Sequence, residues 1–231
     1  MERTYTTKEK IRNWLYYHIW HLAAAALLLA IAASVISNKV SQRKETDDYC
    51  IAYIATAELP GECLRALKSE IGALGVDVNG DGEVTVKINQ YIPSTDTATY
   101  EEAAYGRAAE VAILTDIREG ESYFFLVEYP EDFQLDFQLM AHLDGTASDE
   151  DDFGVWDKVY SWADCPALTA LDLGTSATES GGQIENQALL GKLYLGRRCF
   201  LDPRMKSNSP ENAALWDILT AGASLPKAGD D

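Results

Sequence analysis

A short acidic segment, residues 77–83 with the sequence DVNGDGE, has the side chains and the spacing of a calcium-binding loop. Side-chain oxygens stand at loop positions 1, 3 and 5, and glycine stands at position 6, as in the first half of an EF-hand loop. Calcium takes six or more hard oxygen ligands, which alternate residues of a tight loop can supply. The predicted ligands are Asp77, Asn79, Asp81 and the backbone carbonyl of Glu83. Ca²⁺ is therefore the one cofactor that the sequence suggests.

The second half of this segment departs from the calcium pattern. Ile88 stands at position 12, where an EF-hand has a bidentate carboxylate, and a strand pattern follows in place of a helix. Asn-Gly and Asp-Gly pairs are equally typical of a plain hydrophilic turn. The sequence leaves both interpretations open. A metal bound here would be held weakly and would be structural, because the loop precedes a strand, whereas ligands bind beyond the carboxyl ends of strands.

Residues that could carry catalysis are scarce. Beyond residue 21 the only histidine is His142, which starts an acidic stretch over 142–154. A Ser-His-Asp or Cys-His arrangement would have to use it, and no GxSxG, GxxxxGK[ST] or GxGxxG motif occurs. Carboxylate pairs such as Asp132 with Asp136 are too common in this acidic chain to be informative. We therefore expect a surface histidine and a protein that is not an enzyme.

Alternating strand and helix patterns predict an α/β fold. Residues 60–75 and 100–119 have helical spacing of apolar residues, and the second helix is expected to pack through Ala104, Ala108, Val111, Leu114 and Ile117. Together with the strand patterns this gives strand, helix, strand, helix, strand, which predicts one three-layer α/β/α domain with a largely parallel sheet and right-handed crossovers. The three predicted strands span residues 50–55, 83–91 and 123–127.

The later part of the chain gives weaker patterns. Residues 175–182 are small and polar and predict a loop, 189–200 contain a strand, 210–221 form a final helix, and 222–231 are expected to be a disordered tail.

This order of elements predicts where a ligand would bind. In an open α/β sheet, ligands bind in the crevice at the carboxyl ends of the strands. The residues that follow the predicted strands are Thr56, Glu58, Tyr91, Glu128 and Tyr129. We expect them to be the ligand contacts if a small solute binds, with Tyr91 and Tyr129 lining an open apolar pocket. A filled surface at this position would instead favour an interaction domain.

An uncharged stretch near the N-terminus predicts a membrane anchor. Residues 14–37 contain no Asp, Glu, Lys or Arg, and about 20 apolar residues suffice to cross a bilayer. His18 and His21 lie among aromatic residues at its start and read as part of an interfacial belt. A cleaved signal peptide ending near Ala30-Ile31-Ala32 is the alternative. We expect a cytoplasmic segment 1–13, a single-pass helix 14–37 in the cell membrane, a stalk 38–49 and an extracellular domain 50–221.

Charge and cysteine content limit the partners. The net charge is −18, which argues against nucleic acid because its phosphates would be repelled. No cysteine pair has CxxC spacing, so a zinc site is not expected. Outside the cytoplasm, the cysteines of the domain could be oxidised to disulfides. Cys165 and Cys199 are the first pair to test, and free buried thiols are an equal alternative. The cysteines are Cys50, Cys63, Cys165 and Cys199.

Residues 109–133, AEVAILTDIREGESYFFLVEYPEDF, resemble a segment of extracytoplasmic solute-binding proteins of the periplasmic-binding type II-like class. The strand CIAYIA, the helix after it and the strand VTVKINQY fit the first lobe of that fold in order. The N-terminal apolar stretch and the DVNGDG loop also resemble small membrane-anchored proteins of Gram-positive gut bacteria, a likeness that carries no named function. The resemblance implies a membrane-tethered, non-catalytic extracytoplasmic module that binds a small solute. The alternative is a structural or protein-interaction domain of the cell envelope without a small ligand.

Overall fold

A computed structural model describes residues 7–8, 14–18, 20–21, 27–31, 34, 46–93, 100–149, 151–178, 181–199 and 209–226. The chain divides into two compact units, Met1–Thr46 and Asp47–Asp231. The described residues of the first unit before Thr46 are helical. Among the described residues, no helix is both long enough and apolar enough to cross a membrane. Much of the predicted anchor 14–37 and most of the stalk lie outside the described residues, so the anchor stays a prediction.

A five-stranded sheet forms the centre of the second unit, in the order β2-β1-β3-β7-β4. Strand β1 pairs in parallel with β2 and β3, while β7 is antiparallel to both β3 and β4. Four strands therefore run in one direction and β7 runs in the other, which confirms the predicted α/β class with a largely parallel sheet. The bounds are β1 Tyr49–Ile54, β2 Val86–Tyr91, β3 Phe124–Val127, β4 Val159–Ser161 and β7 Tyr194–Arg197.

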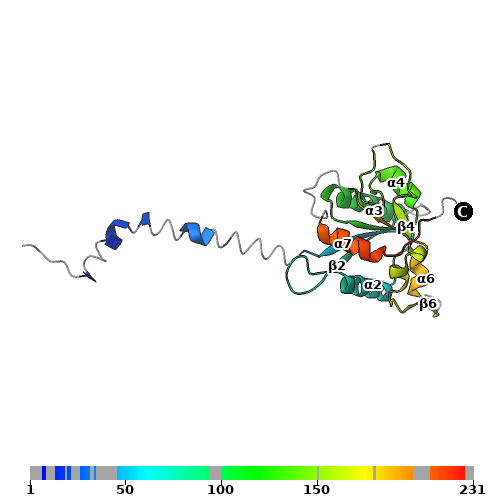
Figure 1. Cartoon of the computed structure of the whole chain (residues 1–231), viewed down its shortest axis with the longest axis horizontal. Coiled ribbons are helices and arrows are strands. Elements are labelled where there is room, and N and C mark those ends of the chain that lie inside the picture. The colour runs from blue at the N-terminus through cyan, green and yellow to red at the C-terminus, as the bar shows by residue number, and fades with distance from the viewer. Residues whose placement is uncertain are drawn as a thin grey trace, which may run out of the picture. The chain divides into compact units, whose positions relative to one another are not determined.

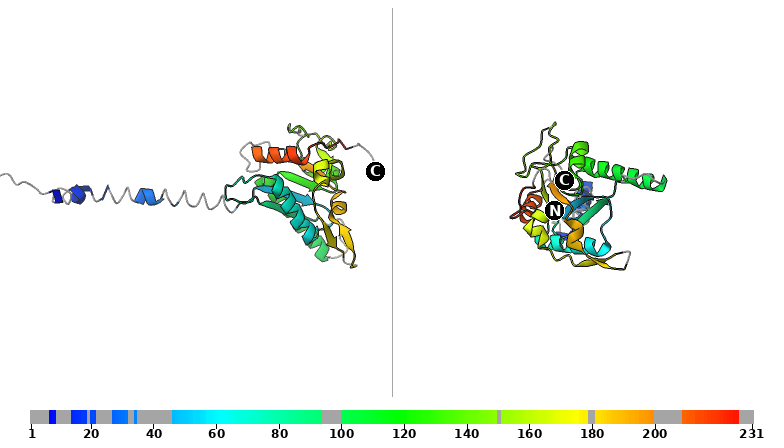
Figure 2. Two further views of the ribbon diagram at one scale, coloured as in Figure 1. Left: turned by 60° about the horizontal axis from the view of Figure 1, so that its bottom comes forward. Right: turned by 90° about the vertical axis from the view of Figure 1, so that its right-hand side faces the viewer.

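Helices cover both faces of this sheet (Figures 1 and 2). Alternate residues of β1 point to opposite faces, so Ile51 and Tyr53 join one apolar cluster and Ala52 and Ile54 join the other. The first cluster is completed by α2 Gly61–Leu74, the 3₁₀ turn η1 Trp162–Asp164, α5 Pro166–Thr169, α6 Asn186–Leu190 and α7 Pro210–Leu219. The second is completed by α3 Tyr100–Glu119 and α4 Pro130–Phe137. A small antiparallel pair, β5 Thr175–Ala177 with β6 Gln183–Glu185, stands apart from the sheet.

Helix α3 has the predicted bounds but turns a different face to the sheet. Ile113 and Asp116 are buried, whereas Val111 and Leu114 are 63% and 55% exposed. The expected packing face, 104–117, is therefore wrong for most of its members. The physical reason is that Asp116 accepts hydrogen bonds from buried partners beneath the helix, including Tyr91. These bonds fix the rotation of the helix more strongly than its apolar pattern does.

The cysteines are all free thiols. Cys165 is buried in the apolar cluster on one face of the sheet, while the backbone of Cys199 pairs with Leu139 beyond the end of β7. These two cysteines, the first pair to test, are not joined, and the structure has the equal alternative of free thiols. Burial raises the pKa of Cys63 to about 11 and that of Cys165 to about 12.

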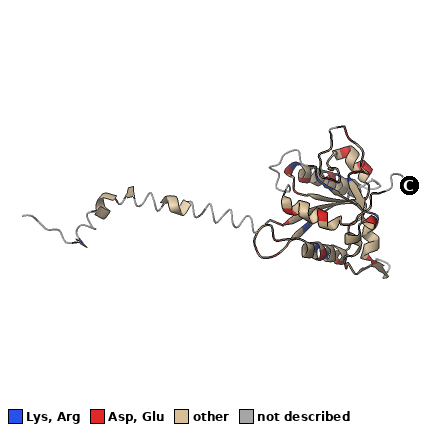
Figure 3. Ribbon diagram, viewed as in Figure 1, with Lys and Arg blue, Asp and Glu red and all other residues tan. Residues whose placement is uncertain are grey.

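The C-terminal end remains attached beyond helix α7. The amide of Ser224 donates to the carbonyl of Asp164 at 3.1 Å, within the stretch expected to be a tail. Residues 227–231 lie outside the described residues. Figure 3 shows that the Asp and Glu positions are distributed over several helices and loops of the domain.

Candidate functional site

At the carboxyl ends of β1 and β3, successive strands switch from one side of β1 to the other. After β1 the first crossover places β2 on one side, and the next crossover returns to place β3 on the other side. The loops that follow β1 and β3 therefore lead to helices on opposite faces of the sheet, and the edge between two such loops is the usual ligand position in open α/β sheets. Two of the predicted contact residues, Thr56 and Glu128, lie in these loops.

Glu128 organises this edge. Its Oε2 accepts hydrogen bonds from both the backbone amide and the Oγ1 of Thr56, each at 2.8 Å. Its Oε1 accepts from Lys192 Nζ at 2.6 Å. The Glu128 side chain is only 11% exposed, whereas that of Lys192 is 45% exposed. Burial acts to raise the pKa of the Glu128 carboxyl, but the bonds from Lys192 and Thr56 outweigh it and leave this pKa below its usual value.

Lys192 was missed by sequence reasoning because its position depends on the direction of β7. A residue that precedes an ordinary parallel strand lies at the amino edge of the sheet. Since β7 is reversed, with Tyr194 opposite Val127, the residues before it reach the carboxyl edge. The sequence predicted a strand in this region but carried no signal for its direction.

The other predicted contacts lie elsewhere or point into solvent. Glu58 is exposed in the loop after β1, and Tyr129 is 54% exposed. Tyr91 is buried, and its hydroxyl donates to Asp116 Oδ2 of α3 at 2.9 Å. Burial, followed by the nearby Asp116 charge, raises the pKa of Tyr91 well above its ordinary value. The structure thus brings Thr56 and Glu128 together but directs Tyr91 towards α3.

Tyr91 belongs instead to a shallow polar pocket of about 440 Å³ between β2 and α3. Tyr129 does not line it, so this pocket is not the common pocket expected for the two tyrosines. The pocket opens beside an ion pair between Lys87 and Glu121, whose side chains are 41% and 40% exposed. Its lining comprises Lys87, Asn89, Gln90, Tyr91, Ala112, Thr115, Asp116 and Glu121.

A buried ion pair lies next to this pocket. Asp116 Oδ1 accepts from the amide of Ser122 at 3.0 Å and lies 3.5 Å from Arg198 Nη1. The hydroxyl of Ser122 donates to Asp116 Oδ2 at 2.5 Å. Both charged side chains are 2% exposed. Burial lowers the pKa of Arg198, against the opposing influence of Asp116. This network joins α3 to the residues after β7 and serves the fold.

The predicted calcium loop is organised by hydrogen bonds to its own backbone. Asp77 Oδ1 accepts from the amides of Gly80 at 2.6 Å and Asp81 at 3.2 Å, and Asp77 Oδ2 accepts from Gly82 at 2.8 Å. The hydrogen bond from the backbone amide of Gly82 is the largest of the influences that lower the pKa of Asp77. Asn79 Oδ1 accepts from Asp81 in the same manner at 2.9 Å. These are the bonds of Asx turns, the chemistry of the plain-turn interpretation.

Asp48, just before β1, also holds this loop. Its Oδ1 accepts from the amides of Val78 at 2.8 Å and Asn79 at 2.9 Å, and its Oδ2 accepts from the amide of Thr85 at 2.7 Å. Asp48 is 8% exposed, so these bonds are largely shielded from water. The sequence pattern of the loop alone could not reveal this contribution from outside it. Calcium binding by Asp77, Asn79, Asp81 and Glu83 stays a prediction.

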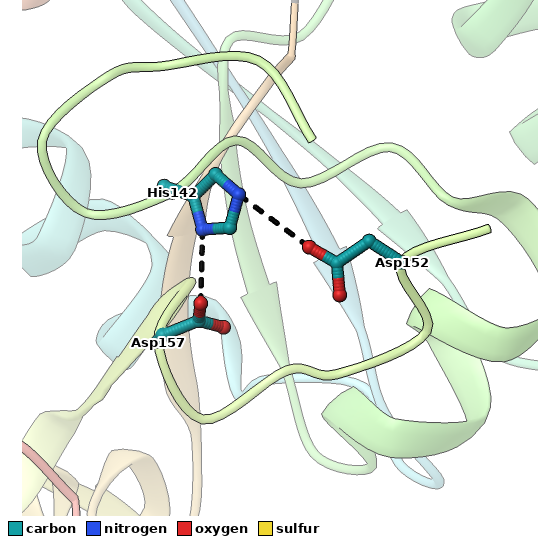
Figure 4. A group of neighbouring side chains, drawn as sticks. All are labelled: His142, Asp152 and Asp157. Carbon is teal, nitrogen blue, oxygen red and sulfur yellow. Dashed lines mark hydrogen bonds and ion pairs between the residues drawn. The ribbon is translucent and has the colours of Figure 1, made fainter. Parts of the chain in front are cut away.

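A different set of side chains has the composition of a metal centre. His142 Nδ1 lies 2.9 Å from Asp157 Oδ2, and His142 Nε2 lies 3.4 Å from Asp152 Oδ2 (Figure 4). Within the described part of the chain, these three residues are the one group of His, Cys, Asp or Glu whose ligand atoms all lie within 4.8 Å of one another. Buried Lys158 adds an ammonium group 2.9 Å from Asp152 Oδ2. The pKa of Asp152 is lowered, chiefly by Lys158.

Sequence reasoning treated His142 as a surface histidine, and its side chain is in fact 27% exposed. Asp152 belongs to the acidic stretch 142–154 and Asp157 follows three residues after it, and the many carboxylates in this part of the chain concealed which of them meet the imidazole. The chain matches no protein-family model, no curated protein and no solved structure.

Proposed function

We propose that residues 47–231 form a non-catalytic binding module that takes a small polar solute at the carboxyl edge of the sheet. The observation that supports this proposal most directly is the meeting of Thr56, Glu128 and Lys192 at the carboxyl ends of β1 and β3. Open α/β folds bind ligands at this kind of position. A solute carrying a carboxylate or an ammonium group could replace one partner of the Glu128–Lys192 pair, and exposed Tyr129 follows Glu128 directly in the chain.

The same geometry favours binding over catalysis. Thr56 Oγ1 donates to Glu128, which is formally a hydroxyl nucleophile beside a base. A general base works best when its pKa lies near the operating pH. Since the pKa of Glu128 is held below its ordinary value, this carboxylate is a poor proton acceptor at neutral pH. The group therefore serves to orient and pair charges.

The proposed location is the cell membrane, with the domain outside the cell. The uncharged stretch 14–37 supports the single-pass anchor, and the resemblance of residues 109–133 to solute-binding proteins supports the ligand class. In this arrangement the N-terminus lies in the cytoplasm.

Thermal unfolding of the full-length chain against separate amino acids, dicarboxylates and sugars tests the proposal. A solute present at 100 times its Kd stabilises a protein by about 2.7 kcal/mol, which raises the midpoint by several degrees. We expect one chemical class to do so for the wild type and not for Glu128→Gln. Glu62→Gln is the matched control, because Glu62 pairs with Arg65 at 3.4 Å on the surface of α2. The proposal fails if no solute stabilises the chain or if Glu128→Gln responds as the wild type does.

An interaction domain without a small ligand is the second candidate. It is favoured by the outward face of α3, where Tyr105, Val111 and Leu114 are 78%, 63% and 55% exposed. Large exposed apolar side chains grouped on one helix are typical of contact surfaces. On this interpretation no solute would stabilise the chain, and a photo-crosslinker at position 108 would capture an envelope protein that Val111→Glu releases.

A further inference from the structure

The hydrogen bond between His142 and Asp157 fixes the proton of the imidazole. Their 2.9 Å separation joins Nδ1 to an ionised carboxylate, which can only accept a hydrogen bond. Nδ1 must therefore carry the proton. In a neutral imidazole the other nitrogen, Nε2, then presents a lone pair.

That lone pair faces a second carboxylate. Asp152 Oδ2 lies 3.4 Å from His142 Nε2, so two atoms that both offer lone pairs approach each other. Such an approach is favourable when a cation lies between them, either a proton or a metal ion. Two ligand atoms on one tetrahedral zinc ion, each about 2.0–2.1 Å from the metal, stand roughly 3.3–3.4 Å apart. The observed separation therefore matches that of two ligands sharing one ion.

We propose that His142 Nε2 and Asp152 bind a divalent transition-metal ion of the zinc type, with Asp157 orienting the imidazole. A carboxylate that accepts the second N–H of a metal-binding histidine is the usual outer partner, and it sets the tautomer and the ring orientation. Figure 4 shows the two carboxylates on different sides of the ring, each beside a different nitrogen. A nitrogen and oxygen ligand pair suits zinc and its neighbours better than calcium or magnesium, which prefer oxygen alone.

Lys158 sets a limit on the affinity. Its side chain is 0% exposed, and its ammonium group lies 2.9 Å from Asp152 Oδ2 and 3.4 Å from Asp157 Oδ1. It also donates to the carbonyl of Gly154. A fixed positive charge beside the ligands opposes a second cation, and two protein ligands leave the remaining positions to water. We therefore expect a Kd on the order of micromolar, well short of a structural zinc site.

This site does not depend on the proposed solute-binding function. The amide of Ala141, next to His142, pairs with the carbonyl of Arg197, which lies opposite Phe124 at the start of β3. Glu128 follows the other end of that strand. The two sites thus use different residues at different ends of β3, and each can be tested without the other.

Calorimetric titration of Zn²⁺ into the full-length chain tests the inference. We expect one saturable site that is weakened about tenfold or more by His142→Gln and by Asp152→Asn. Asp149→Asn, which removes an exposed carboxylate from the same stretch, and His18→Gln/His21→Gln should bind as the wild type does. Co²⁺ should give a spectrum without thiolate charge transfer, which separates this site from the four cysteines.

Three outcomes of the metal titrations would overturn the inference. They are the absence of saturable binding up to about 1 mM Zn²⁺, unchanged binding by His142→Gln, and a thiolate band in the Co²⁺ spectrum. ¹⁵N spectra of His142 give an independent measurement. If Nε2 is protonated at pH 7.5 and stays so in excess Zn²⁺, a proton occupies the position assigned to the metal.

Discussion

Thr56 and Glu128 are 72 positions apart in the chain, yet both hydrogen-bond donors of Thr56 reach the same carboxylate oxygen at 2.8 Å. This contact joins the loops after β1 and β3, the two strands between which the strand order switches from one side of β1 to the other. It also leaves the second oxygen of Glu128 to Lys192. The Glu128 carboxylate therefore holds both Thr56 and Lys192 in place at the proposed binding edge.

The Glu128 pair should make the domain sensitive to acid. The folded-state pKa of Glu128 is depressed, so its contribution to stability is present above the unfolded pKa of about 4.3 and is lost as pH falls through the lower folded value. We expect Glu128→Gln to lower the free energy of unfolding by about 1–2 kcal/mol at pH 7, and we expect the wild type and the variant to differ less below pH 4. Urea unfolding of both proteins at pH 7 and pH 3 measures this difference. An equal loss at pH 7 and pH 3 would contradict the assignment.

The buried pair of Asp116 and Arg198 should be costly to break. Both side chains are 2% exposed, so removing one partner leaves an uncompensated buried charge. We expect Arg198→Met to lower the free energy of unfolding by about 3–5 kcal/mol. Lys87→Met breaks an exposed pair with Glu121 and should cost less than about 1 kcal/mol. Similar losses in the two variants, measured by urea unfolding, would show that burial does not govern this pair.

Asp48 should matter to the loop at 77–83 whether or not calcium binds. Its carboxylate accepts three backbone amides in a shielded position, and replacement by alanine leaves them without a partner. We expect Asp48→Ala to cost about 2–4 kcal/mol in urea unfolding. Exposed Asp47→Ala is the matched control and should change stability by less than about 0.5 kcal/mol. Equal losses of stability in Asp48→Ala and Asp47→Ala would contradict the role assigned to Asp48 in holding the loop 77–83.

Calcium itself distinguishes the two interpretations of that loop. Position 12 lacks a carboxylate, and the Asp77 carboxylate already accepts hydrogen bonds from three backbone amides of the loop. We therefore expect millimolar calcium to leave the unfolding midpoint unchanged. A rise that is reversed by chelation and lost in Asp77→Asn would instead establish a calcium site there.

Three of the four thiols should react slowly in the folded protein. Burial raises the pKa of Cys63 to about 11 and of Cys50 and Cys165 to about 12, so little thiolate is present at pH 8. We expect a thiol-specific disulfide reagent to modify these three only after denaturation, when all four cysteines react. Intact mass measured without reductant checks the pairing. A loss of two mass units per chain would reveal a disulfide.

The sequence predicted the first half of the domain well because its elements are local. Pro60 precedes α2, and buried Cys63, Leu67 and Ile71 recur four residues apart along it. The bounds of α3 agree with the sequence pattern, but its buried face does not, because Asp116 is anchored by Tyr91 and by Arg198, which lies 82 positions later. Such a partner has no local signature.

The second half of the domain shows the same limit. Helix α4, strand β4 and the short helices α5 and α6 were not predicted, since each is between three and eight residues long and depends on packing with distant residues. The candidate site follows this pattern. Thr56 and Glu128 could be placed from the strand ends, but Lys192 and the pairing of His142 with Asp152 depend on tertiary structure.

The amide resonance of Thr56 gives the most direct measurement of solute binding at the β1/β3 edge. ¹H–¹⁵N spectra of the full-length chain are recorded while a stabilising amino acid, dicarboxylate or sugar is added. We expect the Thr56 and Glu128 amide resonances to shift until the site is saturated, because the hydrogen bond between the Thr56 amide and the Glu128 carboxylate is exchanged for a ligand contact. Shifts confined to Asn89 and Thr115, in the pocket between β2 and α3, would contradict it.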